Sequence, residues 1–116
     1  MKQVRLRHVG ILISDWDKIR PFYEGLGFKL FYEEHEVWFD RLNDHRFDLI
    51  VRKMINTGGD ILEFIEGNWC PHHIALTVKE LPRFDILFNF SRKSAVAETV
   101  FLQDPEGNWI EFVKEL

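Results

Sequence analysis

The sequence predicts an α+β domain in which two βαβββ modules form one curved, cup-shaped mixed sheet with the helices on its outside. Two observations support this fold class. Period-2 apolar alternation, helical apolar spacing and glycine turns follow one another in the order strand, helix and three strands. The second half of the chain repeats that order and part of the sequence. The 116 residues therefore predict a single domain, 1–116, with a first module over about 1–68 and a shortened second module over about 69–116.

The first module opens with a strand, because branched apolar residues occupy every second position over 9–13. Ser14 and Asp15 then supply a helix N-cap, and the following apolar residues are spaced along one helix face until Gly27 ends the helix. The expected later elements are a strand over 28–33, a polar loop over 34–46 with room for a short helix, a strand over 47–54, a hairpin turn over 56–59 and a strand over 60–66.

The second module begins after Cys70-Pro71 and has the pattern of a shorter copy. Apolar residues alternate over 73–79, which predicts a strand, and leucine and phenylalanine residues follow helical spacing over 81–88. Two or three short strands complete the module, divided by a turn over 104–107.

An internal repeat aligns four ionisable residues. The segment 7–13 matches 72–78, where His73 follows His8 by 65 residues. The segment 59–65 matches 107–113, where Glu111 follows Glu63 by 48 residues. Each module therefore begins with a histidine strand and ends with a glutamate strand.

Strand parity predicts that these four residues converge. Successive side chains of a strand point to opposite faces, and the branched apolar residues take the face that the helix covers. The other face receives His8, Glu63, His73 and Glu111. Gly10 and Ala75 leave room beside the imidazoles. Two imidazoles and two carboxylates suit a divalent first-row metal, and four ligands in an octahedral site leave two adjacent positions for a substrate with neighbouring oxygens.

Composition excludes several function classes. A net charge of −4 gives no electrostatic attraction to nucleic acid, and no apolar run approaches the roughly 20 residues of a membrane span. The N-terminus lacks a signal-peptide core, and a single cysteine, Cys70, fits a reducing cytoplasm. The 11 Phe, 4 Trp and 2 Tyr indicate an aromatic core or an aromatic-lined cavity.

The motifs of this chain resemble those of the vicinal oxygen chelate superfamily. That superfamily includes glyoxalase I, bleomycin-resistance proteins, fosfomycin-resistance thiol transferases, methylmalonyl-CoA epimerase and extradiol dioxygenases. The resemblance covers essentially the whole chain and is carried by the segments 8–11, 22–28, 73–75 and 104–111.

The resemblance implies a metal site and a reaction type. The metal ligands would be His8, Glu63, His73 and Glu111, and the ion would be Ni, Co, Zn or Mn. This full ligand set resembles bacterial glyoxalase I, in which a glutamate moves a proton between carbons of the substrate. By resemblance Glu111 would be the main base and Glu63 would return the proton on the opposite face. The resemblance also implies a small-molecule substrate and a homodimer.

Two departures from bacterial glyoxalase I argue against glutathione as cofactor. Leu12 stands where an arginine grips the thiol, and the loop that closes over glutathione is absent from the short second module. A different or smaller substrate is expected, in contact with Leu12 and with Trp109, which shares a strand face with Glu111. Trp38 is a candidate hydrophobic lid over the cup, although a dimer contact would give the same pattern.

Three functions remain open at this point. The first is a metal-dependent lyase or isomerase of the glyoxalase type. The second is a metal-dependent resistance transferase of the fosfomycin type, and the third is a metal-free protein that sequesters an aromatic or drug-like ligand. The bound metal and its stoichiometry would separate the third from the other two.

Overall fold

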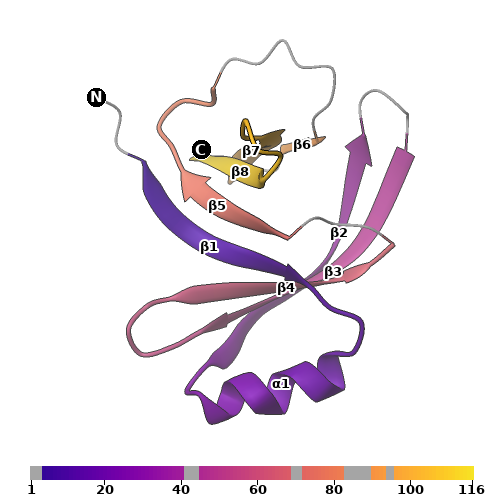
Figure 1. The fold of residues 1–116 in the computed structure, drawn as a ribbon, viewed down its shortest axis with the longest axis vertical. Coiled ribbons are helices and arrows are strands. Elements are labelled where there is room, and N and C mark those ends of the chain that lie inside the picture. Colours follow the sequence, from indigo (N-terminus) through magenta and orange to yellow (C-terminus); the bar gives the residue numbers. More distant parts are fainter. Residues whose placement is uncertain (1–3, 41–44, 69–71, 83–89, 94–95) are drawn as a thin grey trace.

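A computed structural model describes residues 4–40, 45–68, 72–82, 90–93 and 96–116. These residues form one helix and eight strands (Figure 1). In chain order the elements are β1 (Arg5–Leu12), α1 (Trp16–Gly25), β2 (Lys29–Asp40), β3 (His45–Ile55), β4 (Ile61–Gly67), β5 (His73–Thr77), β6 (Phe90–Lys93), β7 (Ala97–Gln103) and β8 (Trp109–Glu115). The described helix is not long and apolar enough to cross a membrane.

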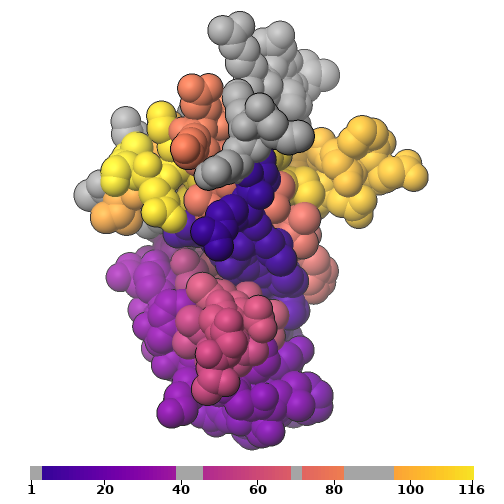
Figure 2. Space-filling model, turned by 90° about the vertical axis from the view of Figure 1, so that its left-hand side faces the viewer, coloured from indigo at the N-terminus to yellow at the C-terminus, as the bar shows by residue number. Residues whose placement is uncertain are grey.

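The strands form one mixed sheet that closes into a barrel in the order β1-β4-β3-β2-β6-β7-β8-β5. Strand β1 is the junction between the two halves of the chain, because it pairs in parallel with β4 and antiparallel with β5. In Figure 2, the indigo residues of β1 lie in the middle of the face, with the purple and pink residues of the first half below them. The predicted fold class, a curved mixed sheet with a helix outside, is confirmed.

Helix α1 covers the outer face of the first-half strands, below β4 in Figure 1. Its buried contact is a cluster of Trp16, Met54 and Phe64, and the last two are fully buried. Partly buried apolar residues from β1, β2, β4 and the helix pack around this cluster. Burial of this aromatic face holds α1 on the sheet even though Pro21 lies inside the helix.

The helix begins as the sequence predicted, and the structure identifies the capping residue. Asp15 has extended backbone dihedral angles, and its carboxylate accepts a hydrogen bond of 3.1 Å from the Asp17 amide. At the other end Gly27 has φ of 98°, a conformation in which a side chain would be strained. The capping carboxylate satisfies an amide that has no partner within the helix.

We expect Asp15→Ala to lower the free energy of unfolding by about 1 kcal/mol, because the first turn of α1 loses its cap. Urea denaturation followed by circular dichroism measures the change. Ser14→Ala is the matched control, since the adjacent Ser14 is exposed and is not the N-cap. Equal losses in the two variants would contradict the assignment of the cap to Asp15.

A second apolar cluster fills one part of the barrel interior. Its buried members are Trp38, Leu49, Val51, Ile65 and Phe101, with Tyr32, Phe47 and Trp109 packed against them. The two clusters lie on opposite faces of β4. Phe64 points to the helix and belongs to the first cluster, whereas the next residue, Ile65, points into the barrel and belongs to the second. Aromatic residues therefore fill both faces of the sheet.

The loop predicted over 34–46, with its possible short helix, is wrong. Strand β2 continues to Asp40, and β3 begins at His45 and pairs with β2 along its whole length. The segment is polar for two different reasons. Glu34 and His35 are exposed, whereas Glu36 is buried and accepts hydrogen bonds from Tyr32 and Trp38. From the sequence alone, a buried carboxylate that accepts two hydrogen bonds cannot be distinguished from a solvated carboxylate.

In the second half, the strands around the turn over 104–107 follow the prediction. The predicted helix over 81–88 lies mostly outside the described residues, and the described Leu81 and Pro82 are not helical. The turn is organised by Asp104, whose carboxylate accepts hydrogen bonds from the amides of Glu106 and Asn108 and from the Asn108 side chain. Gly107 takes the positive φ of 89° that this turn requires. The motif thus starts β8 in a defined register.

Candidate metal centre

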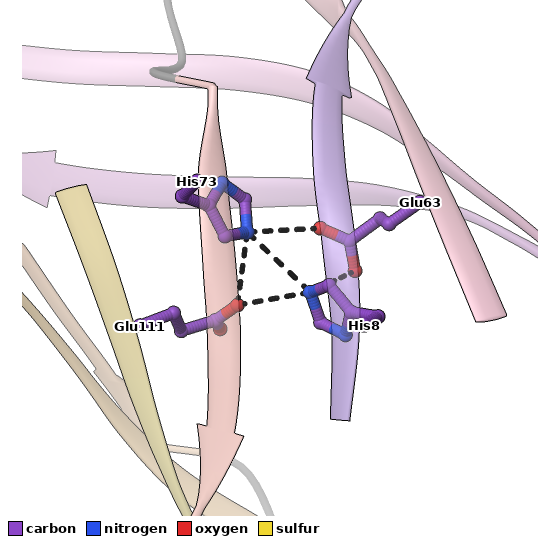
Figure 3. Close-up of side chains that lie close together, drawn as sticks. All are labelled: His8, Glu63, His73 and Glu111. Atoms are coloured by element: carbon purple, nitrogen blue, oxygen red, sulfur yellow. Dashed lines mark hydrogen bonds and ion pairs between the residues drawn. The ribbon is translucent and has the colours of Figure 1, made fainter. Parts of the chain in front are cut away.

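The four residues that the repeat aligned meet inside the barrel. Each of them offers one nitrogen or oxygen atom, and these four atoms lie within 4.8 Å of one another: His8, Glu63, His73 and Glu111. All four residues are buried, with exposed fractions of 4–7 %. Figure 3 shows the two carboxylates approaching the imidazole Nε2 atoms from opposite sides. One chain supplies all four groups.

Strand register explains the convergence. Two rows of residues that are neighbours in register run across adjacent strands of the sheet. Each row places a small residue between an imidazole and a carboxylate. The rows are Glu63–Gly10–His73 on β4, β1 and β5, and His8–Ala75–Glu111 on β1, β5 and β8. Because side chains of one face stand side by side in such rows, the four polar groups point to one volume.

Gly10 is needed for the position of the second imidazole. An ideal Cβ placed on Gly10 would lie 2.1 Å from Cε1 of His73 and 2.5 Å from each of its ring nitrogens. The ring therefore occupies the space that any side chain at position 10 would fill. The sequence-based prediction that Gly10 leaves room beside an imidazole is confirmed, and Ala75 is fully buried in the equivalent place.

The distances between the polar groups are short. Nε2 of His8 and Nε2 of His73 lie 3.4 Å apart, and each lies 3.2 Å from Oε1 of Glu111. Glu63 approaches with Oε2 3.4 Å from His8 and Oε1 3.7 Å from His73. The imidazoles and carboxylates thus surround a common point.

The close carboxylates change the protonation of the cluster. Burial disfavours the charged form of His8, but the close carboxylates of Glu111 and Glu63 outweigh it and raise the His8 pKa to about 9. Burial likewise opposes ionisation of Glu111, yet the nearby His73 and His8 imidazoles hold the pKa of its carboxyl well below its usual range. Without a cation, the cluster keeps a proton on an imidazole to balance two buried carboxylates.

The cluster fits a divalent metal. Although Oε1 of Glu111 lies 3.2 Å from two imidazole nitrogens, it is buried and has no hydrogen-bond partner among the described residues. A buried carboxylate oxygen left in this way is costly unless a cation or proton donor satisfies it. Two neutral imidazoles and two carboxylates form a mixed donor set that zinc, cobalt, nickel and manganese accept, and the two negative charges balance such an ion.

We expect the stability of chelator-treated protein to depend on pH in the way the His8 pKa dictates. The folded-state pKa of about 9 lies above the ordinary histidine pKa of 6.5, so this stabilisation is fully present below pH 6.5 and is lost as the pH rises through 9. Thermal unfolding from pH 6 to pH 10 measures the effect. In His8→Ala the decline over this range should disappear, and an unchanged decline would contradict the assignment to His8.

The other residues predicted to contact substrate lie in different surroundings. Trp109 lines an open cavity of about 730 Å³, which His73 and Gly10 also border. Leu12 is exposed at the end of β1, and its amide donates a hydrogen bond of 3.3 Å to Nδ1 of His72. Trp38 is buried in the barrel core against Phe101. The structure therefore places Trp109 beside His73, its neighbour in register on β5, and places Trp38 in the core.

Sequence reasoning missed one charged residue at the site. Lys53 on β3 pairs in register with Glu63, and its Nζ lies 3.8 Å from Glu63 Oε2. The signal was present, because Lys53 has the same strand parity as the buried Leu49 and Val51. The hairpin turn over 56–59 also sets the register that places it opposite Glu63.

Comparisons with known proteins give one match. No family model and no curated protein matches this sequence. The chain is similar to a glyoxalase family protein from Bacillus cereus, known from its crystal structure, with 13 % sequence identity and a TM-score of 0.44 over 100 % of this chain and 97 % of the other.

Proposed function

We propose that this protein is a metal-dependent lyase or isomerase of the glyoxalase type. Its substrate would be a small molecule that presents two adjacent oxygens, and its reaction would move a proton between neighbouring carbons. The observation that carries the proposal is the buried four-donor cluster, in which Oε1 of Glu111 has no hydrogen-bond partner among the described residues. Burial of two carboxylates at such close range is explained by a cation between them.

The chain's own residues divide into two roles. A divalent ion in the cluster would supply Lewis-acid polarisation of the adjacent substrate oxygens. His8 and His73 present Nε2 toward the common point. Glu111 is the proposed base that accepts the proton at its carboxylate, and Glu63, which approaches from the opposite side, is the proposed group that returns it. Both carboxylates are buried, so the proposed proton transfer would take place away from bulk water.

Metal analysis of untagged protein is the first test. We expect about one Ni, Co, Zn or Mn per chain, since one chain supplies all four donors. The loaded protein is then incubated in D₂O with small 2-oxo and 2-hydroxy compounds, and NMR measures exchange of the C–H protons. Glu111→Gln should abolish the exchange, because the amide cannot accept the proton.

Three outcomes decide the proposal. Protein that takes up no divalent metal would support the metal-free sequestering function and end the proposal. Full exchange in a metal-loaded Glu111→Gln variant would remove Glu111 as the base. A resistance phenotype toward an epoxide antibiotic, with no proton exchange in any substrate, would favour the transferase.

We also propose that the protein forms a homodimer and is located in the cytoplasm. The site itself does not require a second chain, because its four donors come from β1, β4, β5 and β8 of one chain. Sedimentation of metal-loaded protein measures the oligomeric state directly. Glutathione is not proposed as a cofactor, given the Leu12 position and the short second module.

A further inference from the structure

A lysine side chain lies beside the four-donor cluster. Lys53 is on the barrel-facing side of β3, with Leu49 and Val51, and its Nζ lies 3.8 Å from Oε2 of Glu63. Its side chain is 21 % exposed, whereas that of Glu63 is 9 % exposed. The lysine side chain is therefore more accessible to solvent than the carboxylate beside it.

The position of this ammonium group is held from two sides. Nζ lies 4.5 Å from the centre of the Tyr32 ring, a cation–π contact, and Glu63 lies on its other side. Tyr32 is in turn oriented by its hydroxyl, which donates a hydrogen bond of 2.9 Å to Oε2 of Glu36. The other oxygen of Glu36 accepts a hydrogen bond of 3.1 Å from Nε1 of Trp38. These contacts fix the position of the Lys53 ammonium group, so that it can bind a charged group of a ligand.

The charge at the cluster favours an anionic ligand. With a divalent ion, two neutral imidazoles and two carboxylates, the four-donor cluster is neutral. Lys53 then adds a positive charge next to Glu63, whose own charge is shared with the ion. The neighbouring Arg52 points to the outer face, where it pairs with Glu33 and Glu66. Glu36, the further buried carboxylate, already accepts hydrogen bonds from Tyr32 and Trp38.

We infer that Lys53 is a specificity-determining residue, which selects substrates carrying a carboxylate next to a hydroxyl or carbonyl oxygen. This inference rests on the proposed function and narrows its substrate class to 2-hydroxy or 2-oxo acids. Such an acid presents two adjacent oxygens and also the negative charge that balances the Lys53 ammonium group. A neutral compound with the same two oxygens leaves that charge unbalanced.

A matched pair of ligands tests the inference by binding, without any turnover. Glycolate and glycolamide both present a hydroxyl oxygen next to a carbonyl oxygen, but only glycolate is charged. Calorimetry measures their binding to zinc-loaded protein, and zinc stoichiometry is determined in each sample. We expect Lys53→Met to weaken glycolate about tenfold and to change glycolamide much less, because a charge-assisted contact is lost. Methionine keeps an unbranched apolar stem over Tyr32.

Two further variants complete the design. Lys53→Arg keeps the positive charge and should retain the preference for glycolate, and Lys18→Met removes an exposed lysine of α1 and should change nothing. If Lys53→Met binds one zinc per chain but loses affinity equally for both ligands, or for neither, the role of Lys53 is overturned. The proposed function would not be affected by that result. Wild-type protein that takes up no zinc would overturn the proposed function, and the inference with it.

Discussion

The variant His73→Ala is expected to lose bound metal, with an affinity at least about 100-fold weaker than that of the wild type. Removal of a group that merely orients a ligand costs 10- to 100-fold in metal affinity, and His73 is itself a proposed donor. Its side chain is fully buried, and its Nε2 lies 3.2 Å from Oε1 of Glu111, which has no hydrogen-bond partner among the described residues. Metal content after dialysis, followed by competition with a chelator of known affinity, measures the loss.

The adjacent histidine provides the control for this experiment. His72 has the opposite strand parity, is exposed, and accepts a hydrogen bond from the Leu12 amide. His72→Ala should therefore keep one metal per chain. Circular dichroism of both variants shows whether the fold is retained. Stoichiometric metal in a folded His73→Ala protein, or equal loss in both variants, would contradict the four-donor site.

The variant Gly10→Ala is expected to disturb the same site without removing any donor. The new methyl carbon would lie 2.1 Å from Cε1 of His73, a distance that forces the ring to move. Because the ring is enclosed, we expect a loss of about 1–3 kcal/mol in the free energy of unfolding from overpacking. Metal affinity should fall by about 10- to 100-fold, as it does when an imidazole ligand loses its orientation.

Gly25→Ala is the matched glycine control. A Cβ at Gly25 would meet no atom within 4 Å, and the residue ends α1 on the exposed side of the molecule. We expect unchanged metal affinity and an equal or slightly higher free energy of unfolding, because alanine is the better helix residue. Wild-type affinity and stability in Gly10→Ala would show that the His73 ring has another position available.

The site could be predicted from the sequence because two signals coincide. The repeat shows that His8 corresponds to His73 and Glu63 to Glu111, and strand parity places all four on the face away from the helix. Neither signal requires knowledge of how the strands pair. The structure confirms that the four donor atoms lie within 4.8 Å of one another.

The polar segment after residue 33 shows where local patterns fail. Its charge indicated a loop, yet it forms the second part of β2 and contains the buried Glu36. The partners of Glu36 include Tyr32 and Trp38, which are four and two residues away. A strand places residues of equal parity on one face, so these hydrogen bonds exist only once the strand has formed.

The amino-acid sequence by itself determined the order of the strands in the first half, the helix and its ends, and which four ionisable residues come together as the proposed donors. These properties depend on local periodicity, on turn chemistry and on an internal repeat. Only the tertiary structure decided that one chain completes the site and that Lys53 stands beside Glu63. Both follow from strand pairings between distant segments, such as β1 with β5. Those pairings depend on closure of the whole sheet, which no local pattern encodes.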